Sequence, residues 1–352
     1  MHKTSPKRLD CFMAEANAAY YAKKNPFEDF ITSPEISQIF GELIAVWTIM
    51  VGRSIMEKMP QSASFCLVEA GPGRGTLMAD ILRVMRKAAP DLYTRCKLCL
   101  VETSPRLREI QRITLKDHEA ITVQWLDSVY ELPEMPMVFL ANEFLDALPI
   151  RQFVKISEQA WDEIYVQDGM KVKEIVERCP ESPIFHRPVA IGDVVEICEE
   201  GQAIIAFLGR HVSKHNGAAL FIDYGYAQPV WGDSLQALAE GKPVSPFIEP
   251  GCADLTAHID FCSLAEIARN TGATVYGIQT QGRFLSQLGL MARAQKLSAH
   301  ANREEKQQIQ AAIHRLIAPE QMGTLFKVMA LCSPDIAEPP GFMEDERNND
   351  YG

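Results

Sequence analysis

The chain has 352 residues, of which 47% are hydrophobic and 23% charged, enough for one large domain or two smaller ones with a buried core. Its net charge of −11 argues against a nucleic-acid backbone as the main partner. No run of residues approaches the roughly 18 apolar residues of a membrane span, so we expect no membrane-spanning helix.

The cysteines indicate a reducing compartment. They number nine, and four lie inside apolar runs, namely Cys66, Cys99, Cys262 and Cys332. This usage is typical of reduced thiols in a core. Residues 1–24 lack the apolar stretch of a secretory signal. We therefore expect an intracellular protein, in the cytoplasm of a bacterium or, for a eukaryotic host, in the mitochondrial matrix.

The first half of the chain alternates between helices and short apolar strands. Residues 33–59 carry apolar residues at helical spacing, with Ser33 as the expected cap and Pro34 in the first turn. Further strands are expected at 64–70, 97–103, 121–126 and 136–142, and helices at 75–88 and 104–117.

The pattern changes after Leu145. Residues 151–176 alternate as in a β hairpin or meander. The tail from Pro334 is rich in Pro, Asp and Asn, which predicts disorder. Between these segments we expect helices at 199–217, 260–272 and within 282–317, and strands at 218–225, 273–280 and 323–331.

Short apolar strands that alternate with helices predict parallel β-α-β units. The expected fold is α/β, a Rossmann-like and mostly parallel sheet with helices on both faces and an inserted α+β lobe over the carboxyl edge, where ligands bind. The expected parts are an N-terminal helical segment packing on the ligand site (1–60), a Rossmann-like core (61–150), an inserted β-rich and helical substrate lobe (151–217), the rest of the core with an inserted loop and helices (218–332) and a disordered tail (333–352).

A glycine-rich turn, EAGPGRGT at 69–76, follows the first apolar strand. Gly71, Gly73 and Gly75 let the backbone turn tightly and approach a nucleotide-like ligand near a helix N-terminus. The third glycine comes one residue too early for the dinucleotide pattern G-x-G-x-x-G. Glu69, an acid before the first glycine, favours a methyltransferase, whose cofactor has an amino acid end and a sulfonium but no pyrophosphate.

Polar residues follow the next two strands. Glu102 lies at the end of the second strand, where a carboxylate can accept both hydroxyls of a ribose. Its alternative role is a helix cap, which Ser104 already provides. Asp127 and Ser128 follow the third strand, where methyltransferases commonly contact an adenine amino group, and a solvated turn is an equal alternative.

The fourth strand ends in Asn142 and Glu143. A carboxylate at a buried strand end is costly unless it is paired, so packing alone does not explain this sequence. Asp146 would share one face with Glu143 in a helical turn. We therefore expect a substrate site here; the alternative is that Glu143 pairs with an internal arginine, Arg74 or Arg151.

The histidines carry weaker signals. His258, on a long loop after the fifth strand, could act as a base, although a lone histidine is more often structural. His211 and His215 have the spacing of zinc ligands on a helix, but no third ligand is evident, so we expect no metal site. Cys96 and Cys99 form a C-x-x-C inside an expected strand, which favours buried structural thiols over redox chemistry.

Eight stretches of the chain resemble, in the same order, those of the MidA family of class I methyltransferases. That family is related to the mitochondrial complex I assembly factor that methylates arginine in a respiratory subunit. The resemblance runs from about Met13 to Ala330 and rests on DFITSPEISQIFGELIAVW, VEAGPGRGTLMADILR, LVETSPRLREIQ, ANEFLDALPIRQF, FIDYGY, GCADLTAHIDF, TQGRFLSQLGL and MGTLFKVMAL.

The resemblance implies S-adenosyl-L-methionine as cofactor, with S-adenosyl-L-homocysteine as product, and a protein arginine, in a complex I subunit, as substrate. It adds Thr32, Pro34 and Thr76 to the expected cofactor contacts, and implies neither nucleic acid nor a membrane span. The segment before Asp29, KKNPFE, departs from the family, because it is shorter than the expected glycine-containing loop of the cofactor lid.

Two other functions stay open. The glycine-rich turn and Glu102 would also suit a nicotinamide-dependent oxidoreductase, but the early third glycine and the lack of a hydride-transfer motif count against it. A catalytically silent assembly chaperone on the same fold is the second alternative. The intact glycines and the intact N-E-F sequence count against that one.

Overall fold

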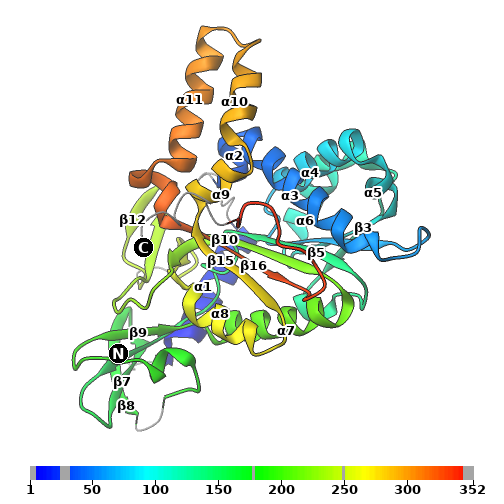
Figure 1. The fold of residues 1–352 in the computed structure, drawn as a ribbon. Coiled ribbons are helices and arrows are strands. Elements are labelled where there is room, and N and C mark those ends of the chain that lie inside the picture. The colour runs from blue at the N-terminus through cyan, green and yellow to red at the C-terminus, as the bar shows by residue number, and fades with distance from the viewer. Residues whose placement is uncertain (1–4, 24–31, 177–178, 248–249, 344–352) are drawn as a thin grey trace, which may run out of the picture. The chain divides into compact units, whose positions relative to one another are not determined.

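The chain forms two compact units, each assembled from separate segments. The computed structural model describes residues 5–23, 32–176, 179–247 and 250–343 (Figure 1). The lobe unit is larger than the insertion expected at 151–217, because it also includes N-terminal and later segments. The core unit contains Ser33–Ala141, Gly209–Ile222 and Gly272–Gly352, and the lobe unit contains Met1–Thr32, Asn142–Leu208 and Asp223–Thr271.

The larger sheet has eight strands. They are β2 (Phe65–Ala70), β3 (Cys96–Val101), β4 (Val123–Leu126), β5 (Met137–Asn142), β10 (Ala218–Tyr226), β14 (Ile259–Asp260), β15 (Thr274–Thr280) and β16 (Phe326–Cys332). Their order is β15-β16-β10-β5-β2-β3-β4, with β14 paired to β10. β2 is parallel to β3 and β5, β3 is parallel to β4, and β15 and β16 are antiparallel. This order confirms the predicted Rossmann-like, mostly parallel sheet.

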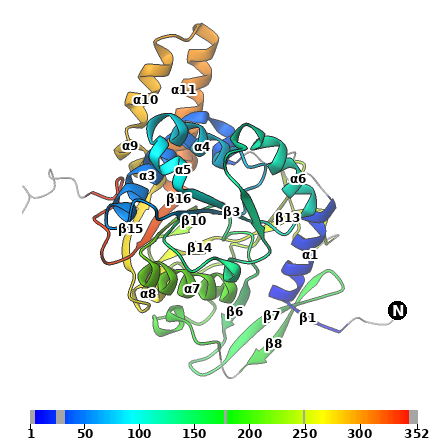
Figure 2. The same cartoon turned by 90° about the vertical axis from the view of Figure 1, so that its right-hand side faces the viewer.

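Helices pack on both faces of this sheet. Figure 2 shows α3 (Gln38–Glu57) and α4 (Thr76–Ala88) on one side and, on the other, the end of α7 (Glu199–His215), which belongs to the core unit from Gly209 onward. In α4 the buried side chains recur at helical spacing, as the sequence predicted: Leu77, Met78, Ile81, Leu82 and Met85. The remaining helices near β2 to β5 are α5 (Pro90–Arg95), α6 (Pro105–Thr114), η2 (Lys116–His118) and η3 (Val129–Glu131).

The helix expected at 33–59 is broken into α2 (Ser33–Ile36) and α3. The break lies at Ser37, whose backbone is extended and whose side chain accepts the N–H of Ile39, so Ser37 is the N-cap of α3. Ser33 is the first residue of α2 rather than the cap of one long helix. The capping serine at position 37, four residues after Ser33, therefore starts a new helix although the apolar periodicity continues across it.

The expectation that no segment could span a membrane needs correction for α3. This helix is long and apolar enough to do so by length and composition. However, 78% of its apolar window is buried inside the fold. Its buried Glu42 also accepts hydrogen bonds from Arg83 and Arg293. α3 is therefore a core helix of this unit.

The C-terminal part of the core unit is helical, as expected, and then ordered further than expected. α10 (Leu290–Ser298) and α11 (Arg303–Ile317) lie side by side in Figures 1 and 2, after α9 (Gln281–Gln287) and before η5 (Pro319–Gly323). The prediction of a disordered tail from residue 333 is wrong up to 343, because Ile336 and Phe342 are buried. Residues 344–352 lie outside the described residues.

The lobe unit is built on two antiparallel sheets. The first confirms the predicted meander, since β6 (Arg151–Lys155), β7 (Trp161–Gln167) and β8 (Met170–Val176) pair in antiparallel fashion. β1 (Lys7–Arg8) and β9 (Val194–Ile197) join this sheet. The second sheet contains β11 (Gln236–Ala239), β12 (Lys242–Val244) and β13 (Asp254–Thr256). The unit also includes η4 (Pro183–His186) and α8 (Phe261–Arg269).

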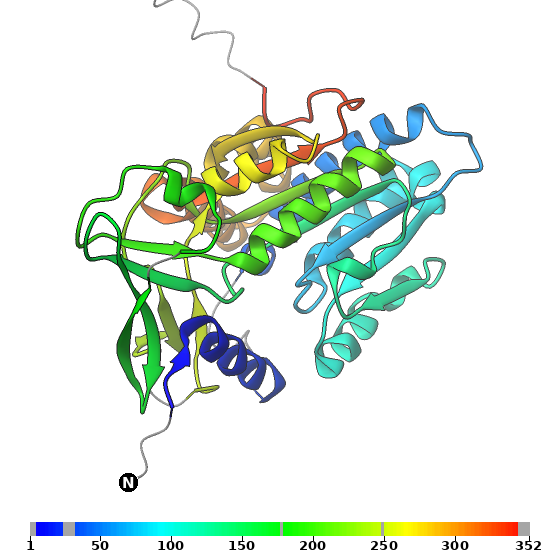
Figure 3. The same cartoon turned by 90° about the horizontal axis from the view of Figure 1, so that it is seen from below.

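The N-terminal helix α1 (Leu9–Lys23) belongs to the lobe unit, and Figure 3 shows it in blue beside the strands of that unit. Its buried residues Leu9 and Met13 share a hydrophobic cluster with Ile164 and Leu255. Asn17 fixes the packing, because its side chain both donates to and accepts from the backbone of Leu255. The expected N-terminal segment 1–60 is therefore divided between the two units at residue 32.

Candidate cofactor and substrate sites

β2 leads directly into the glycine-rich turn, whose three glycines have left-handed backbones. The φ angles are 65° at Gly71, 53° at Gly73 and 81° at Gly75. Gly75 is the N-cap of α4, and its N–H donates to the carbonyl of Pro72 over 2.7 Å. Side chains are disfavoured at such angles, so the turn presents backbone at the start of a helix. This geometry suits close approach by a polar ligand.

Glu69 is a buried carboxyl at the end of β2. It is 3% exposed, and its Oε2 has no hydrogen-bond partner among the described residues. Burial raises the pKa of Glu69 to about 8, because desolvation disfavours the charged form. A buried acid with an unpaired oxygen destabilises the ligand-free fold, and such groups cluster at ligand sites.

The free energy of unfolding of the ligand-free protein should depend on pH because of Glu69. Because its folded pKa is raised, its contribution is fully present below about pH 4.5 and is lost as the pH rises through about 8. The loss amounts to about 5 kcal/mol. In Glu69→Gln this titration is absent, so urea unfolding should show a flatter pH dependence of the unfolding free energy over that range.

Glu42→Gln is the matched control for this measurement. Burial alone would raise the pKa of Glu42, but the hydrogen bonds and charges of Arg293 and Arg83 outweigh it and lower that pKa. The contribution of Glu42 is therefore present above its unfolded pKa and lost as the pH falls. Glu42→Gln should keep the wild-type slope between pH 5 and pH 8. An unaltered slope in Glu69→Gln would contradict the assignment.

Gln111 of α6 connects three parts of the candidate cofactor site. Its Nε2 donates to the carbonyl of Gly73 over 2.8 Å and to Oε2 of Glu102 over 3.3 Å. Its Oε1 accepts from Nε1 of Trp125 in β4 over 2.8 Å. The side chain is completely buried. Gln111 could not be predicted as a site residue, because a glutamine in a charged helix is typical of a solvated position.

Glu102 follows β3, as predicted, and the structure brings it to the glycine-rich turn through Gln111. Its Oε1 also accepts the N–H of Ser104 over 2.8 Å at the start of α6. Burial raises the pKa of Glu102, and the hydrogen bonds from Ser104 and Gln111 oppose that shift. Glu102 thus supports the helix start while its carboxylate lies beside the turn.

Asp127 and Ser128 have partners within the turn after β4. Asp127 is largely exposed and forms an ion pair with Arg108 at 2.5 Å. The Ser128 hydroxyl accepts the N–H of Tyr130 and is the N-cap of η3. Both residues therefore have partners within their own turn or the neighbouring helix α6.

Thr76, the first residue of α4, donates through Oγ1 to Oε1 of Glu35 over 2.6 Å. Glu35 and Pro34 lie in α2, so this contact ties the helix after the glycine-rich turn to α2. Thr32 is the first residue described after the gap at 24–31. Most of the KKNPFE segment, and with it the expected lid, lies outside the described residues.

The predicted substrate residues lie in the lobe unit, on the segment that continues β5. Asn142 ends β5, and its Nδ2 donates to Oε1 of Glu143 over 3.0 Å. The Oδ1 of Asn142 is buried and has no hydrogen-bond partner among the described residues. Glu143 has a left-handed backbone with φ 51°, which is uncommon for a residue with a side chain and frequent at functional sites.

Residues 143–146 form a bend, and the expectation of a helical turn there is wrong. The N–H groups of Phe144, Leu145 and Asp146 all donate to one carboxylate oxygen of Asp223, in β10. A charged acceptor in this position outcompetes the carbonyls that a helical turn would offer.

Of the two arginines named as alternative partners of Glu143, Arg151 pairs with other acids. Arg151 donates to Oε1 of Glu163 over 2.7 Å and to Oε2 of Glu199 over 3.2 Å. Both acids lie in the lobe unit with Arg151. Arg151 is thus already neutralised by acids other than Glu143.

Asp146 and His258 both contact Tyr224. Tyr224 forms a side-chain hydrogen bond with Asp146, and burial raises the pKa of Asp146 to about 6. The rings of Tyr224 and His258 meet edge to face at 5.4 Å between centroids. His258 Nδ1 is 2.6 Å from the hydroxyl of Tyr226. The structure therefore brings together two of the predicted residues that are 112 positions apart, as 258 minus 146.

Asp223 and Tyr224 were missed as site residues in the sequence analysis. Both lie in the FIDYGY stretch, which entered only through the family resemblance. The signal was present, because this stretch is an apolar strand that ends in an acid and aromatics, the same pattern that singled out Asn142 and Glu143. Strand ends at the carboxyl edge of such a sheet should be examined together.

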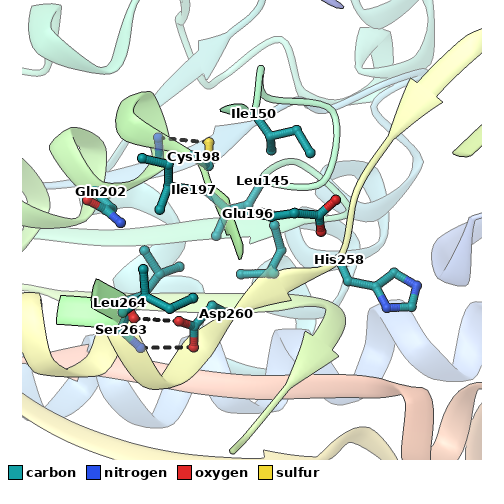
Figure 4. Close-up of a pocket in the computed structure, with 13 residues that line it drawn as sticks. Leu145, Ile150, Glu196, Ile197, Cys198, Gln202, His258, Asp260, Ser263 and Leu264 are labelled. Atoms are coloured by element: carbon teal, nitrogen blue, oxygen red, sulfur yellow. Dashed lines mark hydrogen bonds between the residues drawn. The ribbon is translucent and has the colours of Figure 1, made fainter. Parts of the chain in front are cut away.

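A small cavity lies in the lobe unit behind this segment (Figure 4). It is lined by Leu145, Ile197, Glu196 and His258 among others, and Figure 4 shows the His258 ring pointing away from Cys198. Its volume of about 30 Å³ has room for only a water or two. It is therefore too small for an amino acid side chain.

The thiols and the histidine pair form no additional site. All nine cysteines are free, and Cys66 and Cys99, predicted as core thiols, are buried on neighbouring strands with sulfurs 3.2 Å apart. His211 and His215 lie on α7 with ring centroids 4.7 Å apart. No group of three His, Cys, Asp or Glu side chains arranged to hold a metal occurs within the described ranges.

Comparisons with known proteins agree with the geometry of the glycine-rich turn. The sequence model of a family described as "Putative S-adenosyl-L-methionine-dependent methyltransferase" matches residues 43–279. Protein arginine methyltransferase NDUFAF7, mitochondrial, of Mus musculus is 35% identical over 330 residues, which cover 86% of this chain and 74% of that protein. Its Homo sapiens counterpart is 34% identical, with 86% of this chain and 73% of that protein covered.

A solved structure is similar over nearly the whole chain. It is that of a Burkholderia thailandensis protein bound to S-adenosyl-homocysteine. The two chains superpose with a TM-score of 0.76 at 27% identity, covering 96% of this chain and 90% of the other.

Proposed function

This chain belongs to the family of S-adenosyl-L-methionine-dependent methyltransferases that includes the NDUFAF7 protein arginine methyltransferases, and we propose that it methylates an arginine guanidinium of a protein. The observation that carries the proposal is the bend at 142–146, where acids and an unpaired amide oxygen follow a strand of the cofactor-binding sheet. The nicotinamide-dependent alternative is not favoured by this family membership.

The residues of the core unit fit the cofactor. The left-handed glycines present backbone rather than side chains to a ligand, and the buried, partnerless Oε2 of Glu69 suits the cationic amino acid end. We propose that Glu102 binds the ribose, that Asp127 and Ser128 lie toward the adenine, and that Thr32, Pro34 and Thr76 contribute nearby. When bound, S-adenosyl-L-methionine supplies a methyl group on a sulfonium, which a nitrogen lone pair takes by in-line displacement.

The substrate residues would follow the cofactor-binding strands along the chain. Ala141 of β5 pairs with Ala70 of β2, and these are the residues just before Asn142 and Gly71. An arginine guanidinium has five donors and a fixed charge, so it needs carboxylate and carbonyl acceptors. We propose that Glu143 holds its fork and that Asn142 Oδ1 accepts from the target nitrogen.

Methylation of a protonated guanidinium releases one proton, because the product is again a cation. Asp146, with a pKa of about 6, can accept that proton near neutral pH. Tyr224 forms a hydrogen bond with Asp146 and packs edge to face against His258, so His258 can hold Tyr224 in place beside Asp146. In this proposal Glu143 orients the substrate, and Asp146 handles the proton.

The protein that is methylated is proposed on family grounds alone. The MidA resemblance supports a subunit of respiratory complex I and a role in its assembly. The curated relatives carry mitochondrial in their names, whereas the solved relative is bacterial. We propose that the chain acts where complex I is assembled, in the bacterial cytoplasm or, for a eukaryotic host, the mitochondrial matrix.

Glu102→Ala should weaken S-adenosyl-homocysteine binding about tenfold or more, because each hydrogen bond to a carboxylate contributes roughly 1.5–3 kcal/mol. Glu102→Gln should weaken it less, since one acceptor oxygen remains. Isothermal titration calorimetry measures both. Glu109→Ala, which removes an exposed acid of α6 that pairs with Arg112, is the control and should bind like wild type. Wild-type binding by both Glu102 variants would leave Glu102 as a helix support only.

The proposed reaction is tested by mass spectrometry of respiratory-complex peptides from cells with and without this gene. Arginine peptides should lose a methyl mark when the gene is absent. Incubation of the purified protein with labelled S-adenosyl-L-methionine and the identified subunit should restore it. Failure to transfer any label to that subunit would favour the silent-chaperone alternative.

A further inference from the structure

Asp223 makes an unusual set of contacts with the backbone of the lobe unit. Its Oδ2 accepts N–H groups from Phe144, Leu145 and Asp146 at 3.2, 2.9 and 3.2 Å. Its Oδ1 accepts the N–H of Tyr224 at 2.9 Å. The side chain is 1% exposed. Four backbone donors thus converge on one buried carboxylate.

This arrangement holds a conformation that the bend would not adopt alone. Glu143 has a left-handed backbone, which is strained for a residue with a side chain. The next three residues direct their N–H groups to one point, and hydrogen bonds to a charged acceptor are about twice as strong as neutral ones. Asp223 therefore supplies the interaction that outweighs the strain at Glu143.

The electrostatic surroundings argue that Asp223 does more than pack the end of β10. Burial, and then the charges of Asp146 and Glu143, raise the pKa of Asp223 well above its ordinary value, while the backbone N–H groups of Asp146 and Tyr224 that it accepts favour the ionised form. A buried acid beside two other acids is an expensive way to fill the end of an apolar strand. What offsets the cost of burying Asp223 is that it fixes the backbone conformation of the segment that carries Glu143.

We propose that Asp223 is a positioning residue, whose carboxylate fixes the bend at 143–146 and thereby orients Glu143 toward the substrate. The kinetic part of this inference rests on the proposed arginine methylation. The structural part does not, because it concerns only the backbone of the bend. Asp223 itself touches neither substrate nor cofactor in this scheme.

The first test is hydrogen–deuterium exchange of the ligand-free full chain, read on peptides that contain residues 144–146. In Asp223→Asn the exchange of these amides should be about tenfold faster or more, since one charged acceptor is lost. Asp254→Asn is the matched control, because Asp254 is a buried acid of the same unit that accepts from the hydroxyl of Tyr21. It should leave the exchange at 144–146 as in wild type.

The second test is a double-mutant cycle on methyl transfer. Asp223→Asn should lower kcat about 30-fold while cofactor affinity changes less than about threefold, because only the orientation of Glu143 is lost. In the Glu143→Gln background the same change should cost less than about threefold, since coupled residues are non-additive. Asp223→Glu, which keeps the charge but displaces it, provides a second variant should the asparagine variant not fold.

The outcomes are distinguishable. Wild-type exchange at 144–146 in Asp223→Asn would overturn the proposal, whatever the enzyme's substrate. Fully additive losses in the cycle would also overturn it, since Asp223 would then act independently of Glu143. If the wild-type protein methylates no arginine, the proposed function fails, and the exchange measurement alone decides whether Asp223 fixes the bend.

Discussion

Replacing Gly73 by valine is expected to abolish binding of S-adenosyl-L-methionine while leaving a folded protein. Gly73 has a φ of 53° in the middle of the glycine-rich turn, and its carbonyl is held by Gln111. A valine side chain there would occupy the volume that a closely approaching ligand needs, and a β-branched residue also resists this backbone angle. Calorimetric titration should detect no binding, and circular dichroism should show a folded chain.

The two effects of Gly73→Val, backbone strain and occupation of the ligand's volume, can be distinguished with a variant of a second glycine in the same unit. Gly289 also has a positive φ, 90°, and a Cβ added to it would meet no atom within 4 Å. Gly289→Val therefore introduces comparable backbone strain in open space. It should lower the melting temperature without changing cofactor affinity. Unchanged affinity in Gly73→Val would remove the turn from the binding site.

Glu143→Gln is expected to lower methyl transfer by about two orders of magnitude or more, as is usual when a charged positioning group is lost from a dry site. Glutamine has the same shape and can still accept from Nδ2 of Asn142, so the bend should survive. Cofactor affinity and melting temperature should therefore stay close to wild type. Single-turnover assays with labelled cofactor measure the transfer step.

Glu163→Gln provides the opposite pattern for comparison. Glu163 is a buried acid in the same unit, and it pairs with Arg151 at 2.7 Å. Breaking that pair leaves a partly buried charge, so the melting temperature should fall. If Glu143→Gln instead behaved like Glu163→Gln, or turned over its substrate normally, Glu143 would not be the guanidinium clamp.

The elements of the core unit could be predicted from sequence because each is specified locally. β2 is apolar at nearly every position and buried at all of them. The glycines after it can only serve a tight turn, and α4 buries the stripe that its periodicity showed. Even so, local signals can compete, and the hydroxyl of Ser37 ended a helix that the apolar pattern continued.

The candidate substrate site was predictable in its residues but not in its shape. Asn142 and Glu143 stood out because acids rarely end buried strands. The bend after them depends on Asp223, an acceptor 77 to 79 positions later in the chain. Spacing within a segment cannot reveal such a partner, so the three-residue interval from Glu143 to Asp146 wrongly suggested a helical turn.

The packing of the two ends of the chain also depends on residues that are remote in sequence and so could not be predicted. α1 has too little contrast between its faces to show where it packs, and its partner Leu255 is remote in sequence. The polar segment after Pro334 resembled a disordered tail because its two anchors, Ile336 and Phe342, are isolated apolar residues. Side chains elsewhere hold it, including Gln287, which donates to the carbonyl of Met343.

The packing of α1 in the lobe unit has a consequence for synthesis of the protein. The hydrogen bond of Asn17 cannot form until Leu255, 238 residues later in the chain, has been synthesised. At the usual rates of about 5–20 residues per second, a ribosome needs roughly 10–50 s to reach it. During that interval the apolar side chains of α1 have no native partner from β13. A nascent chain arrested before residue 255 should therefore recruit holding chaperones through its first helix, and release them once β13 has left the exit tunnel.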